Sequence, residues 1–144
     1  MKKLILIVLL IVSNISFSQC QKCTSITEAA KEPEKVKSLI INGYMNPDGP
    51  FSIFPKEIEN FKNLQILYLS DQQFTEIPEF IGNLTTLVEL SLAGGELEKL
   101  PNSIFKLKNL KELLLNDNNF SEDYLVELKK KLKVELPNTK VILE

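Results

Sequence analysis

Residues 64–69, 87–92 and 110–115 read LQILYL, LVELSL and LKELLL, so leucine stands at the first, fourth and sixth position of each stretch. The three stretches begin 23 residues apart. A fixed period of about 20 to 50 residues is the signature of a solenoid, in which each unit buries its apolar face only by stacking on a neighbour. We therefore expect a stack of repeats rather than a fold around one central core.

The same period continues between these stretches. Pro55, Pro78 and Pro101 are 23 residues apart and have apolar neighbours. Successive strand residues point to opposite faces, so the fourth and sixth leucines of each stretch share one face of a short strand. Proline has no backbone N–H, which favours extended chain or short 3-10 turns on the opposite side of the unit. The apolar columns there are Phe54, Ile77 and Leu100; Ile58, Ile81 and Ile104; Phe61, Leu84 and Leu107; and Phe74, Leu97 and Phe120.

The segment IPEFIGNLT at residues 77–85 resembles the convex segment of bacterial and plant leucine-rich repeats, and the three leucine stretches resemble their strand signature. The resemblance covers nearly all of the chain after residue 18. It implies an α/β fold, a short leucine-rich-repeat solenoid with parallel strands on its concave face. It says little about function, because one fold serves many functions. The family's asparagine after the strand is matched only by Asn118, and less regular turns are expected at its other positions, Tyr44, Gln72 and Gly95.

Two longer units flank the regular ones. VKSLII at residues 36–41 and NTKVIL at residues 138–143 repeat the strand pattern with spacings of 28 residues, which predicts about five parallel strands. Apolar residues at helical spacing predict a helix from about Ser121 to Lys133, with Leu125, Leu128 and Leu132 on one face. The capping-box match Ser25-x-x-Glu28 predicts a second short helix that ends before Pro33. We expect these helices to cap the two ends of a domain at residues 36–144, with the N-terminal segment at residues 19–35.

Residues 1–18 have the pattern of a signal peptide. Lys2 and Lys3 precede an apolar run at residues 4–12, which is shorter than the roughly 20 residues that span a bilayer. Small residues before position 19 predict cleavage after Ser18 and an exported protein that is periplasmic, cell-surface or secreted. The alternative is a lipoprotein acylated at Cys20, although Gln19 stands where such signals have a small residue.

Cys20 and Cys23 are the two cysteines of the chain. Because an exported protein meets an oxidising compartment, a local disulfide between them is expected, with free thiols as the alternative. Redox catalysis is disfavoured, since no thioredoxin-like βαβ pattern surrounds the pair. The chain contains no histidine, and two thiolates alone do not complete a zinc site. We expect neither a metal nor another cofactor.

Composition disfavours catalysis and nucleic-acid binding. Without histidine the commonest general base is missing, and no serine or cysteine has a recognisable activating partner. Glu89 and Glu112 share a column, but neighbouring carboxylates on a strand are usually solvated and not an acid–base pair. Removal of Lys2 and Lys3 leaves 15 basic and 19 acidic residues, a net charge of −4, which disfavours phosphate backbones. The lysines at residues 129–133 suit the end of a helix, as a solvated face.

Alternation along the strands predicts a binding surface on the concave face. Ile40, Ile66, Tyr68 and Leu114 are expected to form an apolar cluster among acidic and polar side chains. Such a centre within a polar rim is typical of protein interfaces, although scattered exposed apolar residues need no function. We predict a monomeric, non-enzymatic module without a membrane span that binds a protein or a glycan; a structural, surface-anchored component is the alternative. The predicted contact residues are Ile40, Ile66, Tyr68, Ser70, Glu89, Ser91, Glu112, Leu114 and Asn116.

Overall fold

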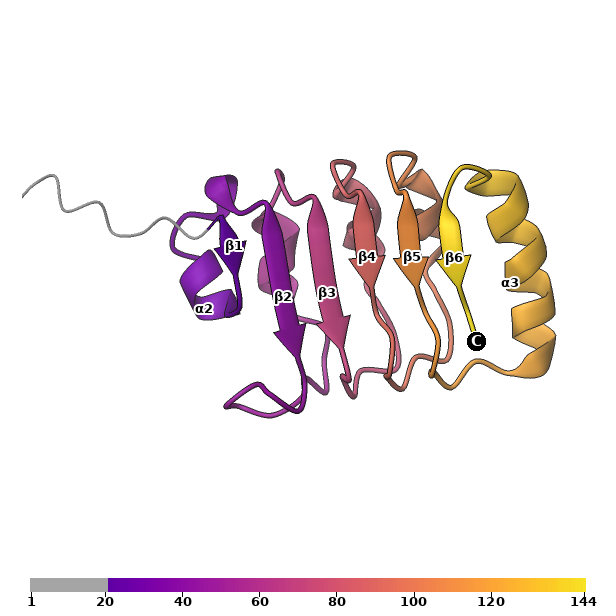
Figure 1. The fold of residues 1–144 in the computed structure, drawn as a ribbon, viewed down its shortest axis with the longest axis horizontal. Helices are drawn as coiled ribbons and strands as arrows, with labels where there is room; N and C mark the ends of the chain where they lie inside the picture. Colours follow the sequence, from indigo (N-terminus) through magenta and orange to yellow (C-terminus); the bar gives the residue numbers. More distant parts are fainter. Residues whose placement is uncertain (1–20) are drawn as a thin grey trace, which may run out of the picture.

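The computed structural model describes residues 21–144, so the predicted signal peptide and Cys20 lie outside the described residues. Within that range one parallel sheet runs in sequence order from β1 to β6 (Figure 1). The five expected strands are β2 to β6, and β1 is an additional short strand at the N-terminal edge. The strands are β1 Lys22–Cys23, β2 Ser38–Asn42, β3 Ile66–Ser70, β4 Glu89–Ser91, β5 Glu112–Leu114 and β6 Lys140–Ile142.

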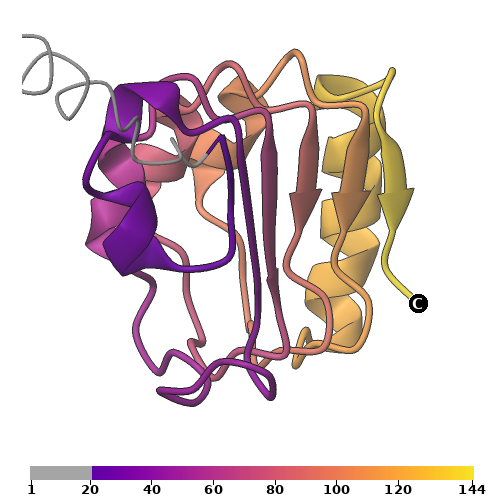
Figure 2. The ribbon, with the colours of Figure 1, turned by 60° about the vertical axis from the view of Figure 1, so that its left-hand side comes forward.

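Short 3-10 helices form a second layer behind the sheet, as Figure 2 shows from the side. They are η2 Lys56–Asn60, η3 Glu79–Asn83 and η4 Asn102–Lys106. Pro55, Pro78 and Pro101 directly precede them with φ angles of −66°, −70° and −69°. The fixed φ of proline suits this position, and its missing N–H costs no hydrogen bond there. The expectation of short 3-10 turns behind the strands is confirmed.

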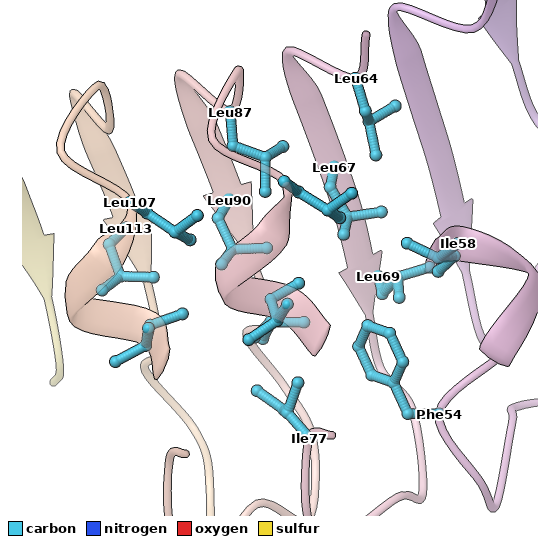
Figure 3. Packing of buried hydrophobic residues seen from close by; sticks show 14 of the residues in the cluster. Phe54, Ile58, Leu64, Leu67, Leu69, Ile77, Leu87, Leu90, Leu107 and Leu113 are labelled. Atoms are coloured by element: carbon cyan, nitrogen blue, oxygen red, sulfur yellow. The ribbon is translucent and has the colours of Figure 1, made fainter. Parts of the chain in front are cut away.

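The apolar core lies between these two layers. Leu67, Leu90 and Leu113 are fully buried and stand in register on neighbouring strands (Figure 3). Ile58 and its equivalents in the other 3-10 helices face them and are also fully buried. Full burial of such a side chain stabilises the fold by about 1.5–3 kcal/mol. The stacked leucines therefore both hold the units together and fix which strand residues point outward.

Gln72 stabilises the turn after β3 in the way that Asn118 stabilises the turn after β5. The Gln72 side chain accepts a hydrogen bond from Phe51 N at 2.8 Å and donates to the carbonyls of Ser70 and Ile41 at 2.9 and 3.3 Å. The Asn118 side chain accepts from the equivalent N–H, that of Leu97, at 3.0 Å. It donates to Leu92 O at 2.8 Å and Asn116 O at 3.4 Å, which are equivalent to the carbonyls of Ile41 and Ser70, and also to Leu115 O at 2.9 Å. The extra methylene of glutamine is accommodated, so the turn at Gln72 keeps its hydrogen bonding, contrary to expectation.

Helices close both ends of the stack. α3, Glu122–Glu135, begins at Ser121, whose Oγ accepts a hydrogen bond from Tyr124 N at 3.3 Å. It buries Leu128 and Leu132, and it ends two residues later than expected. α2, Ile26–Ala29, and the 3-10 helix η1, Pro33–Lys35, lie beside β1, and Ser25 makes no side-chain capping bond to α2. The predicted capping box at α2 is therefore not formed. No helix in residues 21–144 has the length and apolar character needed to cross a membrane.

Candidate functional site

The sheet face that points away from the core, here called the concave face, presents side chains in rows across the strands. The central row runs from β2 to β6, because each of its members pairs in register with the next. A second row lies two residues earlier along each of the strands β3 to β6, and it is called the acidic row because its two middle members are glutamates. The central row is Ile40, Tyr68, Ser91, Leu114 and Ile142, and the acidic row is Ile66, Glu89, Glu112 and Lys140.

The central row contains two apolar patches rather than one. Ile40 is 46% exposed, and Tyr68 is half-buried beside it on β3. Leu114 and Ile142, both half-buried, form the second patch. Ser91 lies between the patches and is only 5% exposed, so its larger neighbours cover it. The expected single cluster is therefore divided at β4, and Ser91 offers little surface to a partner.

Tyr68 and Glu89 form the centre of the concave face. The Tyr68 hydroxyl donates a hydrogen bond to Glu89 Oε2. The pKa of Tyr68 is raised to about 12. This hydrogen bond is the largest cause, burial is the next, and the negative charges of Glu89 and Glu112 contribute least. The bond also fixes the phenol ring against the sheet, which reduces the side-chain entropy that binding has to remove.

Glu112 is paired with a residue of the last strand. Lys140 Nζ donates to Glu112 Oε1 at 2.6 Å, and both side chains are partly exposed, so the pair contributes about 0–1 kcal/mol to stability. Glu89 and Glu112 lie side by side on neighbouring strands. Glu89 accepts a hydrogen bond from Tyr68, and Glu112 forms an ion pair with Lys140. Lys140 and Ile142 were not among the predicted contact residues, although they belong to the acidic row and the central row. The sequence could have identified both, because the strand pattern at residues 138–143 places Lys140 and Ile142 at outward positions.

Polar side chains close the face at the carboxyl ends of the strands. Ser70 Oγ lies 3.4 Å from Ser91 Oγ, and Asn116 Nδ2 donates to Asp117 Oδ2 at 2.5 Å. Asp71 accepts a hydrogen bond from Asn42. Asp71 and Asp117 both adopt a φ of 57°, a conformation that aspartate tolerates better than most residues. This edge therefore presents carboxylates and amides to solvent.

The loop after β2 adds an exposed apolar surface that the sequence analysis did not predict. Tyr44, Met45 and Ile53 are 85%, 84% and 80% exposed. The loop is held in place because Asn42 Oδ1 accepts hydrogen bonds from the N–H groups of Tyr44 and Met45. It extends from the carboxyl end of β2 at one corner of the sheet (Figure 1). The sequence signal for this loop was the spacing of 28 rather than 23 residues from Val36 to Leu64.

In residues 21–144, no group of three or more histidine, cysteine, aspartate or glutamate side chains is placed to hold a metal ion. Cys23 is buried in β1. Because Cys20 lies outside the described residues, the Cys20–Cys23 disulfide stays a prediction.

Comparison with known sequences gives one strong match. The family described as a leucine-rich repeat region matches residues 19–135, which is most of the chain. A search among curated proteins found no significant match.

Solved structures with the same fold come from bacteria and a plant. A leucine-rich-repeat protein of Leptospira interrogans is 31% identical over 83% of this chain, with a TM-score of 0.66. An internalin of Listeria monocytogenes is 20% identical over 84%, with a TM-score of 0.58. The ectodomain of the receptor kinase SOBIR1 of Arabidopsis thaliana is 21% identical over 85%, with a TM-score of 0.57. The chain covers 28%, 32% and 62% of these structures, so it is shorter than all three.

Proposed function

The chain belongs to the leucine-rich-repeat family, and on this premise we propose that it is an extracytoplasmic module that binds another protein through its concave face. The central row carries the proposal. Ile40, Tyr68 and Leu114 place apolar surface on a rigid sheet, and carboxylates and amides surround them. Protein interfaces commonly combine an aromatic and apolar centre with a polar rim.

The charge of the concave face narrows the chemistry of the partner. Glu89 and Glu112 lie on one side of the central row, and Asp71 and Asp117 lie at the carboxyl ends of the strands. Lys140 is the one basic side chain in the acidic row. A partner surface with apolar side chains and nearby lysine or arginine complements this pattern, and opposite charges speed association and exclude wrong partners.

Two observations support a location outside the cytoplasm. Residues 1–18 have the pattern of a secretory signal peptide. The fold is also that of a receptor-kinase ectodomain and of an internalin. We propose no catalytic activity, since the serines of the concave face, Ser70 and Ser91, contact each other and no activating base.

The test is a pull-down with the tagged chain against an extract of the cells that make it. Tyr68→Ala and Leu114→Glu alter the two apolar patches, and the matched controls Glu59→Ala and Lys106→Glu alter exposed residues of η2 and η4. We expect one protein to be enriched by the native chain and by both controls, and to be lost with Tyr68→Ala and with Leu114→Glu. Equal recovery with all five proteins contradicts the assignment of the concave face.

A further inference from the structure

The two apolar patches of the central row are separated by a distance that an extended peptide can span. Ile40 and Tyr68 form one patch on β2 and β3, and Leu114 and Ile142 form the other on β5 and β6. Neighbouring strands lie about 4.8 Å apart, so the centres of the patches are about 14 Å apart across β4. In an extended peptide, side chains four residues apart point the same way and are separated by about 13.5 Å. A segment laid across the strands can therefore place one apolar side chain on each patch.

The residue midway between those two apolar side chains lies over β4. Ser91 is the central-row residue of β4, and its small side chain is only 5% exposed, so it does not rise above its neighbours. Glu89 points outward from the same strand two residues earlier, about 6.8 Å away. A long side chain that starts over Ser91 can therefore lie along β4 and bring its end to the Glu89 carboxylate.

The acidic row has a charge that one added cation neutralises. Glu89 and Glu112 are neighbours in register, and Lys140 pairs with Glu112, so two carboxylates and one ammonium give a net charge of −1. Glu89 uses Oε2 to accept from Tyr68, and Glu112 uses Oε1 to accept from Lys140. Glu89 Oε1 and Glu112 Oε2 accept no hydrogen bond from the residues that the structure describes. These two oxygens can accept from a donor of a partner.

Arginine fits this position better than lysine. Its planar guanidinium has five N–H donors in a fixed arrangement that suits carboxylate oxygens, and it also stacks on aromatic rings. The Tyr68 ring is held next to Glu89 by its hydroxyl, and the charges of both Glu89 and Glu112 raise the pKa of Tyr68, so both carboxylates act on the phenol. An aromatic ring attracts a cation within about 6 Å of its centre. A guanidinium at this point therefore has two carboxylates and one ring within reach.

We propose that the partner presents an extended segment with the pattern apolar–x–arginine–x–apolar, which lies across the strands of the concave face. Its arginine binds Glu89 and Glu112 and stacks on Tyr68. Its two apolar side chains pack on the two apolar patches. The proposal rests on the function proposed above and names the chemistry that the partner brings to the same site. A second copy of the chain cannot supply the arginine, because all 17 basic residues of the chain are lysines.

The test titrates the isotope-labelled whole chain with two acetylated and amidated peptides of equal composition and follows the amide signals by NMR. In LSRSL the arginine points to the same side as both leucines, whereas in LRSSL it points to the opposite side of the extended peptide. We expect LSRSL to bind saturably, with the largest shifts in β3 to β5, and LRSSL to bind at least fivefold more weakly. LSRSL with citrulline in place of arginine loses the charge but keeps the shape, and it should also bind at least fivefold more weakly.

Variants of the chain assign the effect to the acidic row. Glu89→Gln should weaken the binding of LSRSL at least fivefold, whereas the matched control Glu59→Gln alters an exposed residue of η2 and should leave the Kd within twofold. Lys140→Gln removes the cation that competes for Glu112, so binding should tighten at least twofold. A purely structural role of these side chains does not predict changes of opposite sign. The amide spectrum of each variant shows whether it is folded.

The proposal is overturned if LSRSL and LRSSL bind equally well, if Glu89→Gln leaves the Kd unchanged, or if the shifts are confined to η2, η3 and η4. Its failure can be distinguished from failure of the proposed function. If LSRSL does not bind, but Tyr68→Ala and Leu114→Glu still abolish recovery in the pull-down, the concave face binds a partner of different chemistry and this proposal is wrong. If LSRSL binds as expected, but all five proteins recover the partner equally, the preference for this pattern is supported and the function assigned to the concave face is wrong.

Discussion

Gln72 occupies a position where the family pattern has asparagine, and its buried amide satisfies three backbone groups. Gln72→Ala leaves Phe51 N and the carbonyls of Ile41 and Ser70 without these partners. Unsatisfied buried polar groups are costly, so we expect the free energy of unfolding to fall by roughly 2–3 kcal/mol. Urea denaturation followed by circular dichroism measures this change.

The adjacent Gln73 provides the matched control. Its side chain is exposed, and Gln73→Ala should change the free energy of unfolding by no more than about 0.5 kcal/mol. If the two alanine variants are equally stable, Gln72 does not act as the structural equivalent of Asn118.

Tyr68 allows the electrostatics of the concave face to be measured directly. Its pKa of about 12 depends first on the hydrogen bond to Glu89, so Glu89→Gln should move the pKa toward the ordinary value of 10.0. NMR of ring-labelled tyrosine across an alkaline titration resolves Tyr68 from the exposed Tyr44. The exposed control Glu59→Gln should leave the pKa of Tyr68 unchanged. If the pKa of Tyr68 is also unchanged in Glu89→Gln, the hydrogen bond to Glu89 is not the cause of the shift.

The sign of the effect on stability follows from the direction of the shift. Folding raises the pKa of Tyr68, so the Tyr68–Glu89 bond stabilises the fold fully below pH 10 and progressively less as the pH rises toward 12. Part of the alkaline loss of stability should therefore be absent in Tyr68→Phe.

At the scale of elements, the two capping helices differ at their first residue. Ser121→Ala removes the Oγ that accepts from Tyr124 N, and we expect a loss of about 1 kcal/mol in the free energy of unfolding. Ser25→Ala is the control, because Ser25 makes no side-chain capping bond and its replacement should change stability by a few tenths of a kcal/mol at most. Equal losses in both variants would show that the hydrogen bond at Ser121 is not the stabilising contact.

The sequence predicted the elements whose apolar residues recur at a regular spacing. β2 to β6 and α3 follow from leucine spacing, since each leucine must face the same core. β1 was not expected, because the two residues Lys22 and Cys23 are too few to show any alternation. The predicted capping box at Ser25 is not formed. α2 has only four residues, and a pattern of side-chain types does not determine whether the capping hydrogen bonds form.

At the scale of the molecule, the sequence predicted which side chains point outward but not what surrounds them. Ile40, Tyr68 and Leu114 lie on the concave face as strand alternation requires. The burial of Ser91 and the pairing of Glu112 with Lys140 depend on neighbouring strands and on side-chain size, which no single repeat specifies. The exposure of Tyr44 and Met45 depends on a loop that departs from the period.

The short stack presents two chemically different surfaces. The concave face combines apolar patches with carboxylates, whereas a groove between β6 and α3 is lined by apolar side chains together with Lys129 and Lys133.

Hydroxyl-radical footprinting of the complex with the partner recovered by the pull-down tests the concave-face proposal most directly. Mass spectrometry then compares oxidation of each side chain in the free and bound chain. We expect partner binding to protect Ile40, Tyr68 and Leu114, while Phe80 of η3 and Phe105 of η4 react as in the free chain. Protection of Phe80 and Phe105, with Tyr68 and Leu114 unchanged, would contradict binding through the concave face.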